Sequence, residues 1–288
     1  MLTPSLICPV RNCACRLELG PWGARCERGH CFDRARSGYV NLLQPQDRRS
    51  STPGDSRAAV RARQRVLDGG LASVLRRVLL QAVGDCRGKM AGSEVSGLSS
   101  VLDVGCGCGY FLAAVCREFA AEGWGVDLSS AAVDAAARRY PDCRWLVVNA
   151  DRSLPFADAG FDLLLTITSR KNPAEFRRVL RPGGRLIAVV SGEEDLAELR
   201  ERILGEALAV DRVAGTVELF RGMFDLENEY LARDRLFLER PALADLLISS
   251  YRGARRRPQE KLARIDAMEV TLSHRLLMFR LAEGTTYK

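Results

Sequence analysis

Cysteine and histidine side chains gather near the start of the chain, in the stretch CPVRNCACRLELGPWGARCERGHCF (residues 8–32). Six residues of these two types lie there: Cys8, Cys13, Cys15, Cys26, His30 and Cys31. Thiolate and imidazole groups carried in pairs on two short turns are the usual ligands of a tetrahedral zinc ion. The stretch therefore predicts a metal site with four ligands.

Spacing within this stretch selects four ligands, which are Cys8, Cys13, Cys26 and His30. Gly29 eases a tight bend in the second of the two turns. Cys15 is the rival to Cys13, whereas Cys31 directly follows His30 and is expected to point elsewhere. The alternative is a set of buried or free thiols without metal. Against that alternative, four ligands at this spacing are hard to obtain by chance in a chain with only two histidines.

The residues between the two turns predict a zinc ribbon. Leu17 and Leu19 alternate with polar residues as in a short strand, and GPWG (20–23) indicates a turn into a second strand. We expect two strands with one ligand-bearing turn, or knuckle, at each end. GYVNLL (38–43) is an apolar strand that docks this ribbon. The predicted ribbon domain spans residues 1–45.

The first quarter of the chain is its basic part. Residues 1–70 hold twelve arginines and six acidic residues, while the whole chain has a net charge of +7 and a pI near 9.0. An anionic polymer is a plausible partner, and a solvated basic surface is the alternative. A helix capped by Asp55 or Ser56 follows a polar linker, within a basic segment of residues 46–75. Guanidinium groups suit phosphate, which gives four RNA-binding candidates: Arg48, Arg49, Arg57 and Arg61.

A glycine-rich loop, SVLDVGCGCGYF (100–111), lies between a short apolar strand and a helix. Glycines at such a turn let the backbone approach a ligand closely. Asp103 stands two positions before Gly105, and E/D-x-G-x-G-x-G is the motif of S-adenosylmethionine-dependent methyltransferases. Asp127 follows at the tip of the next strand, where an acid accepts hydrogen bonds from ribose hydroxyls. The loop therefore predicts an S-adenosylmethionine site, and a bare Rossmann-like scaffold is the alternative.

Strands and helices alternate through the rest of this region. A third strand ends at Asp151, which is placed to meet the adenine amino group, and strands at 161–170 and 185–192 flank a helix at 172–184. This order predicts an α/β fold with a doubly wound, mostly parallel sheet that binds ligands at the carboxyl ends of its strands. The residues at those ends are the cofactor-binding candidates: Asp103, Gly105, Cys106, Gly107, Cys108, Gly109, Asp127, Leu128, Ala150 and Asp151.

The C-terminal third is less distinctive. We expect an amphipathic helix at 193–208 and two last strands, 229–240 and 268–281, that pair antiparallel at the sheet edge. The basic segment 251–261 lies between these strands, and His274 is interpreted as structural. No apolar run reaches the length of a membrane span, and the N-terminus lacks signal-peptide features. The ten cysteines then favour a reducing, cytoplasmic location.

The chain as a whole resembles RlmA-type methyltransferases, which modify N1 of a guanine in 23S ribosomal RNA. CERGHCFDRARSGYVNLL, RRSSTPGDS and VLDVGCGCGY carry the resemblance. It implies a class I methyltransferase fold over residues 76–288 behind an RNA-recognising ribbon, with S-adenosylmethionine and structural Zn²⁺ as cofactors. It also implies ribosomal RNA as partner, no membrane association and a possible homodimer. Macrolide resistance and housekeeping modification both stay open as roles.

This sequence departs from the family pattern at several points. Two extra residues separate Cys8 from Cys13, and Cys108 replaces an acid in the glycine loop. Ala72 stands where a tyrosine is expected and Asp195 where a histidine is expected; both positions tend to line the cofactor pocket, so Asp195 joins the cofactor candidates. A small-molecule methyltransferase and a catalytically impaired RNA-binding scaffold are the rival readings. No catalytic base is identified among the nearby acids, which are Asp151, Asp158 and Glu175.

Overall fold

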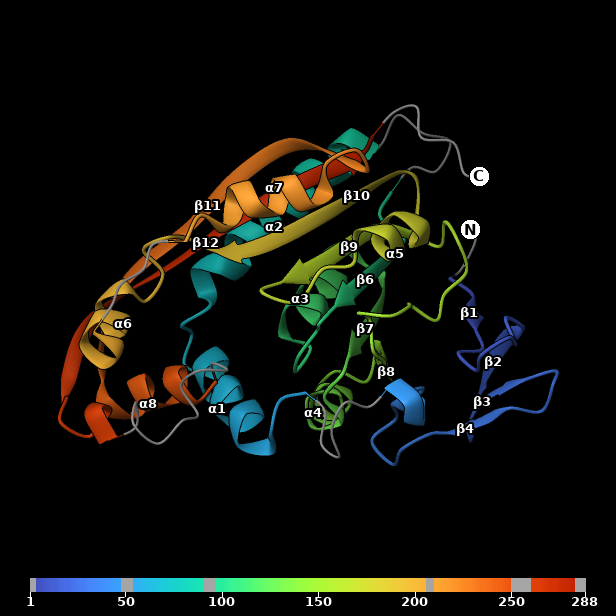
Figure 1. Ribbon diagram of the computed structural model, residues 1–288, viewed down its shortest axis with the longest axis horizontal. Coiled ribbons are helices and arrows are strands. Elements are labelled where there is room, and N and C mark those ends of the chain that lie inside the picture. Colours follow the sequence, from blue (N-terminus) through green and yellow to red (C-terminus); the bar gives the residue numbers. More distant parts are fainter. Residues whose placement is uncertain (1–3, 48–53, 91–96, 206–209, 250–259, 283–288) are drawn as a thin grey trace.

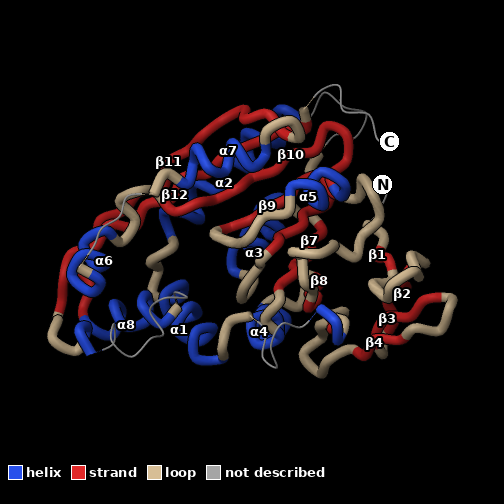
Figure 2. Tube along the Cα trace, viewed as in Figure 1, coloured by secondary structure: helices blue, strands red, loops and turns tan. Residues whose placement is uncertain are grey.

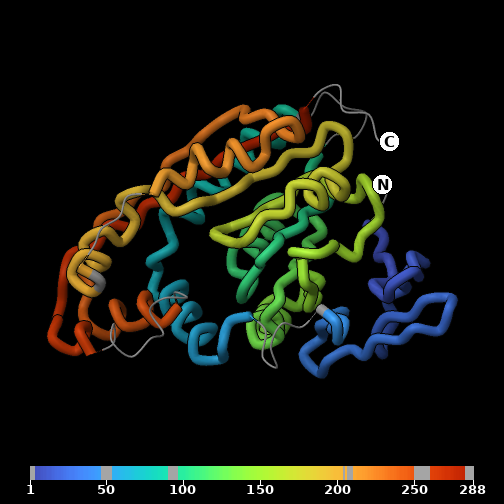
Figure 3. The backbone as a smooth tube through the Cα atoms, viewed as in Figure 1, coloured from blue at the N-terminus to red at the C-terminus, as the bar shows by residue number. Residues whose placement is uncertain are grey.

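The structure is a computed structural model that describes residues 4–47, 54–90, 97–205, 210–249 and 260–282. These residues form a four-stranded sheet and an eight-stranded sheet. Figure 1 shows the small sheet at one end of the molecule, and the helices α6 and α8 at the other. In Figure 3 the blue N-terminal segment lies at the right, and the orange and red segment runs from the lower left along the top toward the upper right.

The small sheet is the expected ribbon, extended by a strand on each side. Its strands lie in chain order: β1 (Leu6–Ile7), β2 (Arg16–Gly20), β3 (Gly23–Cys26) and β4 (Cys31–Asp33). The expectation of one knuckle at each end is wrong. Strands β2 and β3 pair antiparallel with Leu17 opposite Cys26, so the start of β2 lies beside the end of β3. Both knuckles therefore meet at one end of the hairpin.

The large sheet confirms the doubly wound prediction. Its strands are β5 (Val40–Asn41), β6 (Ser100–Val104), β7 (Glu122–Asp127), β8 (Arg144–Val147), β9 (Phe161–Ile167), β10 (Leu180–Ser191), β11 (Phe224–Glu239) and β12 (Ala267–Leu281). They lie in the order β11-β12-β10-β9-β6-β7-β8-β5. Neighbours from β10 to β5 are parallel, whereas β12 runs antiparallel to both β10 and β11. The expected antiparallel edge pair is thus present. Strand β5 extends this sheet although it falls inside the segment predicted as ribbon.

Helices cover both faces of the large sheet (Figure 2). They are α1 (Arg57–Asp68), α2 (Ser73–Met90), α3 (Tyr110–Phe119), α4 (Ser130–Arg139), α5 (Pro173–Val179), α6 (Ala197–Leu204), α7 (Arg212–Phe220) and α8 (Arg240–Ile248), with a 3₁₀ turn at Pro45–Asp47. Helices α2, α3 and α4 pack on one face, and α5, α7 and the ribbon pack on the other. Helix α1 packs against α8 and α4 instead. Ser56 caps α1 by accepting a hydrogen bond from the Ala59 amide.

The core consists of two apolar layers separated by the sheet. Leu163 and Leu165 of β9 face helices α2 to α4, while Leu164 faces the other layer. Both faces of the strand are buried, which explains why it reads as one continuous apolar run. The ribbon belongs to the second layer through Leu6 and Leu17. Backbone hydrogen bonds also join it to the segment at Phe156, since the Ile7 amide donates to the Pro155 carbonyl.

None of the helices in the described ranges is long and apolar enough to cross a membrane.

Candidate cofactor cavity and metal centre

A cavity of 860 Å³ opens along the carboxyl edge of the large sheet. Ten of the eleven cofactor candidates line it: Asp103, Gly105, Cys106, Gly107, Cys108, Asp127, Leu128, Ala150, Asp151 and Asp195. Gly109 does not. It is the left-handed residue that begins α3, and a Cβ there would lie 2.4 Å from the Trp145 ring. Its role is therefore to let the helix start close to the sheet.

Close packing explains the first glycine of the loop. A Cβ on Gly105 would lie 2.4 Å from Cβ of Ser169, at the end of β9. The Ser169 hydroxyl is 2.7 Å from both the Thr166 hydroxyl and the Val104 carbonyl oxygen. The carboxyl ends of β6 and β9 are thus tied together beneath the cavity.

Asp127 fixes the other side of the loop. Its Oδ2 accepts a hydrogen bond from the Gly107 amide at 2.9 Å, and its Oδ1 accepts one from the Ser129 amide at 2.8 Å. Burial raises the pKa of this carboxyl, and the two amides oppose that effect. A carboxylate oxygen accepts more than one hydrogen bond. Asp127 therefore keeps the capacity to accept hydrogen bonds from a ligand in the cavity.

Asp103 supplies a direct test of whether the cavity fits the cofactor. The side chain is buried, and its Oδ1 has no hydrogen-bond partner among the described residues. Burial, together with the charge of Asp127, raises the pKa of Asp103 to about 8. A buried polar oxygen without a partner costs free energy, and a cationic ligand group would supply one. S-adenosylmethionine carries a sulfonium and an ammonium group, so the acidic side chains of the cavity fit this cofactor.

Asp151 and Asp195 hold contacts that the sequence does not reveal. Asp151 pairs with Arg170 across 2.5 Å and is partly exposed at the cavity wall. Asp195 Oδ1 accepts the Ser273 amide at 3.0 Å, which fixes the carboxylate beside strand β12. The position where the family pattern expects a histidine thus presents a rigidly held acid to the cavity.

Several residues of the cavity wall are not among the candidates selected from the sequence, for example Arg63 and His274. Arg63 of α1 pairs with Asp55 at 2.9 Å and donates to the Ser249 carbonyl at 2.8 Å, beside the glycine loop. His274 of β12, interpreted as structural, also lines the cavity, and burial lowers its pKa. Neither has a local sequence signal, because α1 and β12 reach the site only through tertiary packing.

Two of the three acids considered as bases lie away from the cavity. Glu175 and Asp158 both pair with Arg178, at 2.7 Å and 2.9 Å. Neither lines the 860 Å³ cavity, although Asp151 does.

The four residues selected by spacing in the ribbon come together. One ligand atom from each of Cys8, Cys13, Cys26 and His30 lies within 4.8 Å of the others. Sγ of Cys13 is 3.8 Å from Sγ of Cys26, and Nδ1 of His30 is 3.5 Å from Sγ of Cys8 and 3.4 Å from Sγ of Cys26. Tetrahedral Zn²⁺ with ordinary bond lengths places two sulfurs about 3.8 Å apart and a sulfur and a nitrogen about 3.6 Å apart. The cluster therefore has the dimensions of a zinc site.

The two remaining thiols of the stretch are placed elsewhere. Cys15 donates to the Cys13 carbonyl at 3.4 Å, and Cys31 is exposed and donates to the Gly29 carbonyl. Neither belongs to the four-residue cluster, although the Cys15 thiol also contacts the Cys13 side chain.

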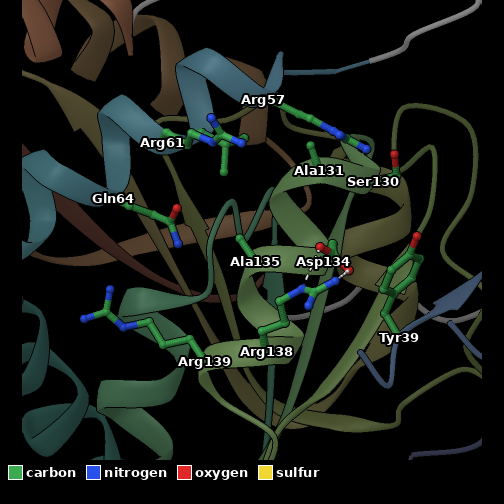
Figure 4. Close-up of a pocket in the computed structure, with 11 residues that line it drawn as sticks. Tyr39, Arg57, Arg61, Gln64, Ser130, Ala131, Asp134, Ala135, Arg138 and Arg139 are labelled. Carbon is green, nitrogen blue, oxygen red and sulfur yellow. Dashed lines mark hydrogen bonds and ion pairs between the residues drawn. The ribbon is translucent and has the colours of Figure 1, made fainter. Parts of the chain in front are cut away.

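The arginines predicted to bind RNA fall into two groups. Arg48 and Arg49 lie outside the described residues. Arg57 and Arg61 line a second cavity of 700 Å³ between α1 and α4 (Figure 4).

Fold and cavity together define a class I S-adenosylmethionine-dependent methyltransferase that carries an N-terminal zinc ribbon. Comparison with known families agrees, since a model described as "Methyltransferase domain" matches residues 101–184 and one described as "RlmA, N-terminal" matches the zinc ribbon at residues 6–51. The chain belongs to the RlmA-type family of 23S ribosomal RNA guanine-N1-methyltransferases.

Curated relatives match along nearly the whole chain. The 23S rRNA (guanine(748)-N(1))-methyltransferase of Streptomyces fradiae is 34% identical, over 93% of this chain and 94% of its own. A relative from Micromonospora griseorubida, named provisionally for the same kind of reaction, is 33% identical over 97% of this chain and 98% of its own. A solved geranyl diphosphate methyltransferase bound to S-adenosylmethionine matches at 18% identity and a TM-score of 0.48, over 81% of this chain and 93% of that one.

Proposed function

We propose that the protein transfers a methyl group from S-adenosylmethionine to N1 of a guanine in a hairpin of 23S ribosomal RNA. The observation that carries this proposal is the joint presence of a ribbon cluster and a cofactor cavity in one packed unit, since ribbon residues share a core layer with the methyltransferase sheet. The chain-length similarity to enzymes named for this reaction supports the same substrate.

The residues of the cavity order the cofactor along the sheet edge. Asp127 would hold the ribose hydroxyls and Asp151 the adenine amino group, at the ends of β7 and β8. Asp103 and the glycine loop would hold the methionine part, at the end of β6. When bound, S-adenosylmethionine supplies an electrophilic methyl group on a positively charged sulfur. This orientation leaves the side of the cavity toward β10 and β12 for the guanine.

That side of the cavity carries three titratable groups, which are Asp195, Asp234 and His274. Guanine N1 holds a proton at neutral pH, so its attack on the methyl carbon requires that proton to leave as the carbon–sulfur bond breaks. Burial keeps His274 neutral by lowering its pKa, and a neutral imidazole can accept a proton. We assign the acceptor to this group of three, with His274 as the first candidate.

The ribbon would serve as a rigid RNA-recognition platform. We assign Cys8, Cys13, Cys26 and His30 as ligands of one structural Zn²⁺, because their spacing and their distances both fit. We also assign Arg48, Arg49, Arg57 and Arg61 to contacts with RNA phosphates. The target guanine must be unstacked from its hairpin to enter the cavity.

With ribosomal RNA as the substrate, we place the protein in the cytoplasm. We leave the homodimer as a proposal to be checked by light scattering.

A defined reaction tests the proposal. Purified protein, S-adenosylmethionine and an unmodified 23S rRNA transcript are incubated, and reverse transcription is run across the product. Methylation of N1 blocks base pairing, so we expect a new stop at one hairpin guanine. The control is an Asp127→Ala variant, which should give no stop.

Two other outcomes would support the rival functions. Methyl transfer from S-adenosylmethionine to small molecules in a ribonuclease-treated extract would favour a small-molecule methyltransferase. Failure to bind S-adenosylmethionine in calorimetry, with the fold intact by circular dichroism, would favour an RNA-binding scaffold.

A further inference from the structure

A basic groove lies between α1 and α4, on the far side of α1 from the cofactor cavity. Its volume is 700 Å³, which is in the range that accommodates a nucleotide-sized ligand. Four arginines and one aspartate line it: Arg57, Arg61, Arg138, Arg139 and Asp134. Figure 4 shows Arg57, Arg61 and Gln64 projecting from α1, opposite the α4 side chains, with Tyr39 at one edge.

Helix periodicity explains how the groove is built. Arg57, Arg61 and Gln64 stand at positions i, i+4 and i+7 of α1 and therefore share one face. On α4, Ala131 and Ala135 face them, and these small side chains leave the space open. The last turn of α4 then contributes Arg138 and Arg139. The groove therefore has long cationic side chains on the α1 side, and small residues followed by two arginines on the α4 side.

The cations of the groove differ in how they are held. Arg138 pairs with Asp134 at 2.9 Å, and Asp134 also accepts the Ser37 hydroxyl at 2.7 Å. Arg139 pairs with Asp68 at 2.6 Å. By contrast, no ion pair joins Arg57 or Arg61 to a carboxylate among the described residues, although the charge of Arg57 contributes to lowering the pKa of Asp134. The two α1 arginines thus present guanidinium groups whose donors are available to an anion from outside.

From these observations we propose that the α1–α4 groove binds the phosphodiester backbone of the RNA strand that carries the target guanine. Guanidinium forks pair with phosphate oxygens, and the Tyr39 ring offers a stacking surface for a base. The inference rests on the proposed function and extends it to Arg138, Arg139 and Tyr39. The groove also has the right location, because Arg63, Val66 and Leu67 of the same helix line the cofactor cavity. An α-helix is about 10 Å across, so a strand held here lies one helix away from the methyl donor.

Paired double variants test the groove. Arg57→Ala/Arg61→Ala removes the two unpaired cations, while Arg77→Ala/Arg117→Ala removes two exposed helical arginines outside it. Binding to the unmodified 23S rRNA transcript is measured by filter retention at several salt concentrations. We expect the groove variant to bind roughly tenfold to a hundredfold more weakly, with a salt slope reduced by about 2. The control variant should keep the wild-type affinity and slope.

Further readouts separate the possible failures. Calorimetry should show unchanged S-adenosylmethionine binding in both variants, which verifies that the cavity is folded. RNA binding by the groove variant equal to that of the wild type would overturn the proposal. So would a change of its oligomeric state in light scattering, because the groove would then be a contact between copies. If the wild-type protein gives no reverse-transcription stop but its RNA binding still depends on Arg57 and Arg61, guanine methylation fails as the function and the groove stands.

Discussion

The Gly107 amide donates a hydrogen bond to Oδ2 of Asp127 across 2.9 Å, joining the second glycine of the loop to the tip of the neighbouring strand. The two residues are 20 positions apart in the chain. Their bond holds the loop in the conformation that forms the cavity floor, and it uses a carboxylate that also lines the cavity. If Asp127 binds the ribose as proposed, loop order and cofactor recognition depend on one side chain.

Replacement of Asp127 by asparagine should weaken S-adenosylmethionine binding roughly tenfold to a hundredfold. An amide group can accept only through one of its two atoms, so one of the charge-assisted bonds to Gly107 or Ser129 is lost, at about 1.5–3 kcal/mol. Isothermal calorimetry measures the affinity. The matched control is Asp142→Asn at an exposed turn position, which should bind the cofactor like the wild type. Equal affinities for both variants would contradict this role of Asp127.

The buried carboxyl of Asp103 should make folding stability depend on pH. Its pKa in the folded protein is about 8, above the ordinary value of 3.8, so the folded state binds more protons than the unfolded state between these values. The contribution of Asp103 to stability is then fully present below about pH 4 and is lost as the pH rises toward about 8. Asparagine does not titrate. We therefore measure urea unfolding without cofactor. Relative to the wild type, the free energy of unfolding of the Asp103→Asn variant should increase by up to about 1.4 kcal/mol for each pH unit in this window.

The same carboxyl should couple cofactor binding to proton release. A cationic ligand beside Oδ1 favours the ionised form of Asp103, so the affinity of the wild type should rise with pH up to the pKa of the free protein, about 8. Calorimetry in buffers of different ionisation enthalpy measures the released proton. The Asp103→Asn variant should release none through this group, and an identical proton release from both proteins would refute the coupling.

Loss of a zinc ligand should affect RNA binding more than cofactor binding. The Cys26→Ser variant should contain less than one zinc per chain by elemental analysis and should bind the 23S rRNA transcript weakly, because metal binding supplies folding free energy to such ribbons. No ribbon side chain among residues 4–45 lines the cofactor cavity, so the affinity for S-adenosylmethionine should stay close to that of the wild type. Cys31→Ser is the control, since Cys31 is exposed and outside the cluster. A full zinc content in Cys26→Ser would argue against the ligand assignment.

Two glycines with nearly the same positive φ should respond differently to alanine. Gly109 and Gly183 have φ of 79° and 80°, but an added Cβ meets the Trp145 ring at 2.4 Å in the first and open space in the second. Gly183→Ala should lower the free energy of unfolding by about 1 kcal/mol through backbone strain alone. Gly109→Ala adds overpacking of about 1–3 kcal/mol. Chemical denaturation measures the free energy of unfolding of both variants. Equal losses would mean that the Trp145 ring moves aside without a free-energy cost.

His274 should affect the rate of methyl transfer more than the binding of the cofactor. The His274→Gln variant cannot accept a proton, so its kcat should fall roughly a hundredfold if it is the acceptor of the guanine N1 proton. The wild-type rate should decrease at low pH as His274 becomes protonated, and this dependence should vanish in the variant. Asp158→Asn serves as the control, because Asp158 pairs with Arg178 away from the cavity. A purely structural His274 would change the melting temperature and leave the pH profile as it was.

Local patterns in the sequence determined much of this protein. The alternation of strand and helix, the glycine loop with Asp103 and Asp127, and the spacing of Cys8 and His30 all follow from short-range chemistry. A parallel sheet brings the carboxyl ends of its strands to one edge. The residues at the predicted strand ends are therefore enough to predict where the cavity lies. The family resemblance, carried by whole segments such as CERGHCFDRARSGYVNLL, is confirmed by the relatives that match nearly the full chain.

Tertiary structure alone decided what lies across from these residues. The antiparallel pairing of Leu17 with Cys26 set both knuckles at one end of the hairpin, and strand pairing is a long-range choice that no local pattern encodes. Packing of α1 against α8 and α4 placed Arg63 over the glycine loop and turned Arg57 and Arg61 into a separate groove. His274 reached the cavity because β12 pairs with β10. Each of these contacts joins segments far apart in the chain, where the packing of the whole core, and not the neighbouring residues, fixes the geometry.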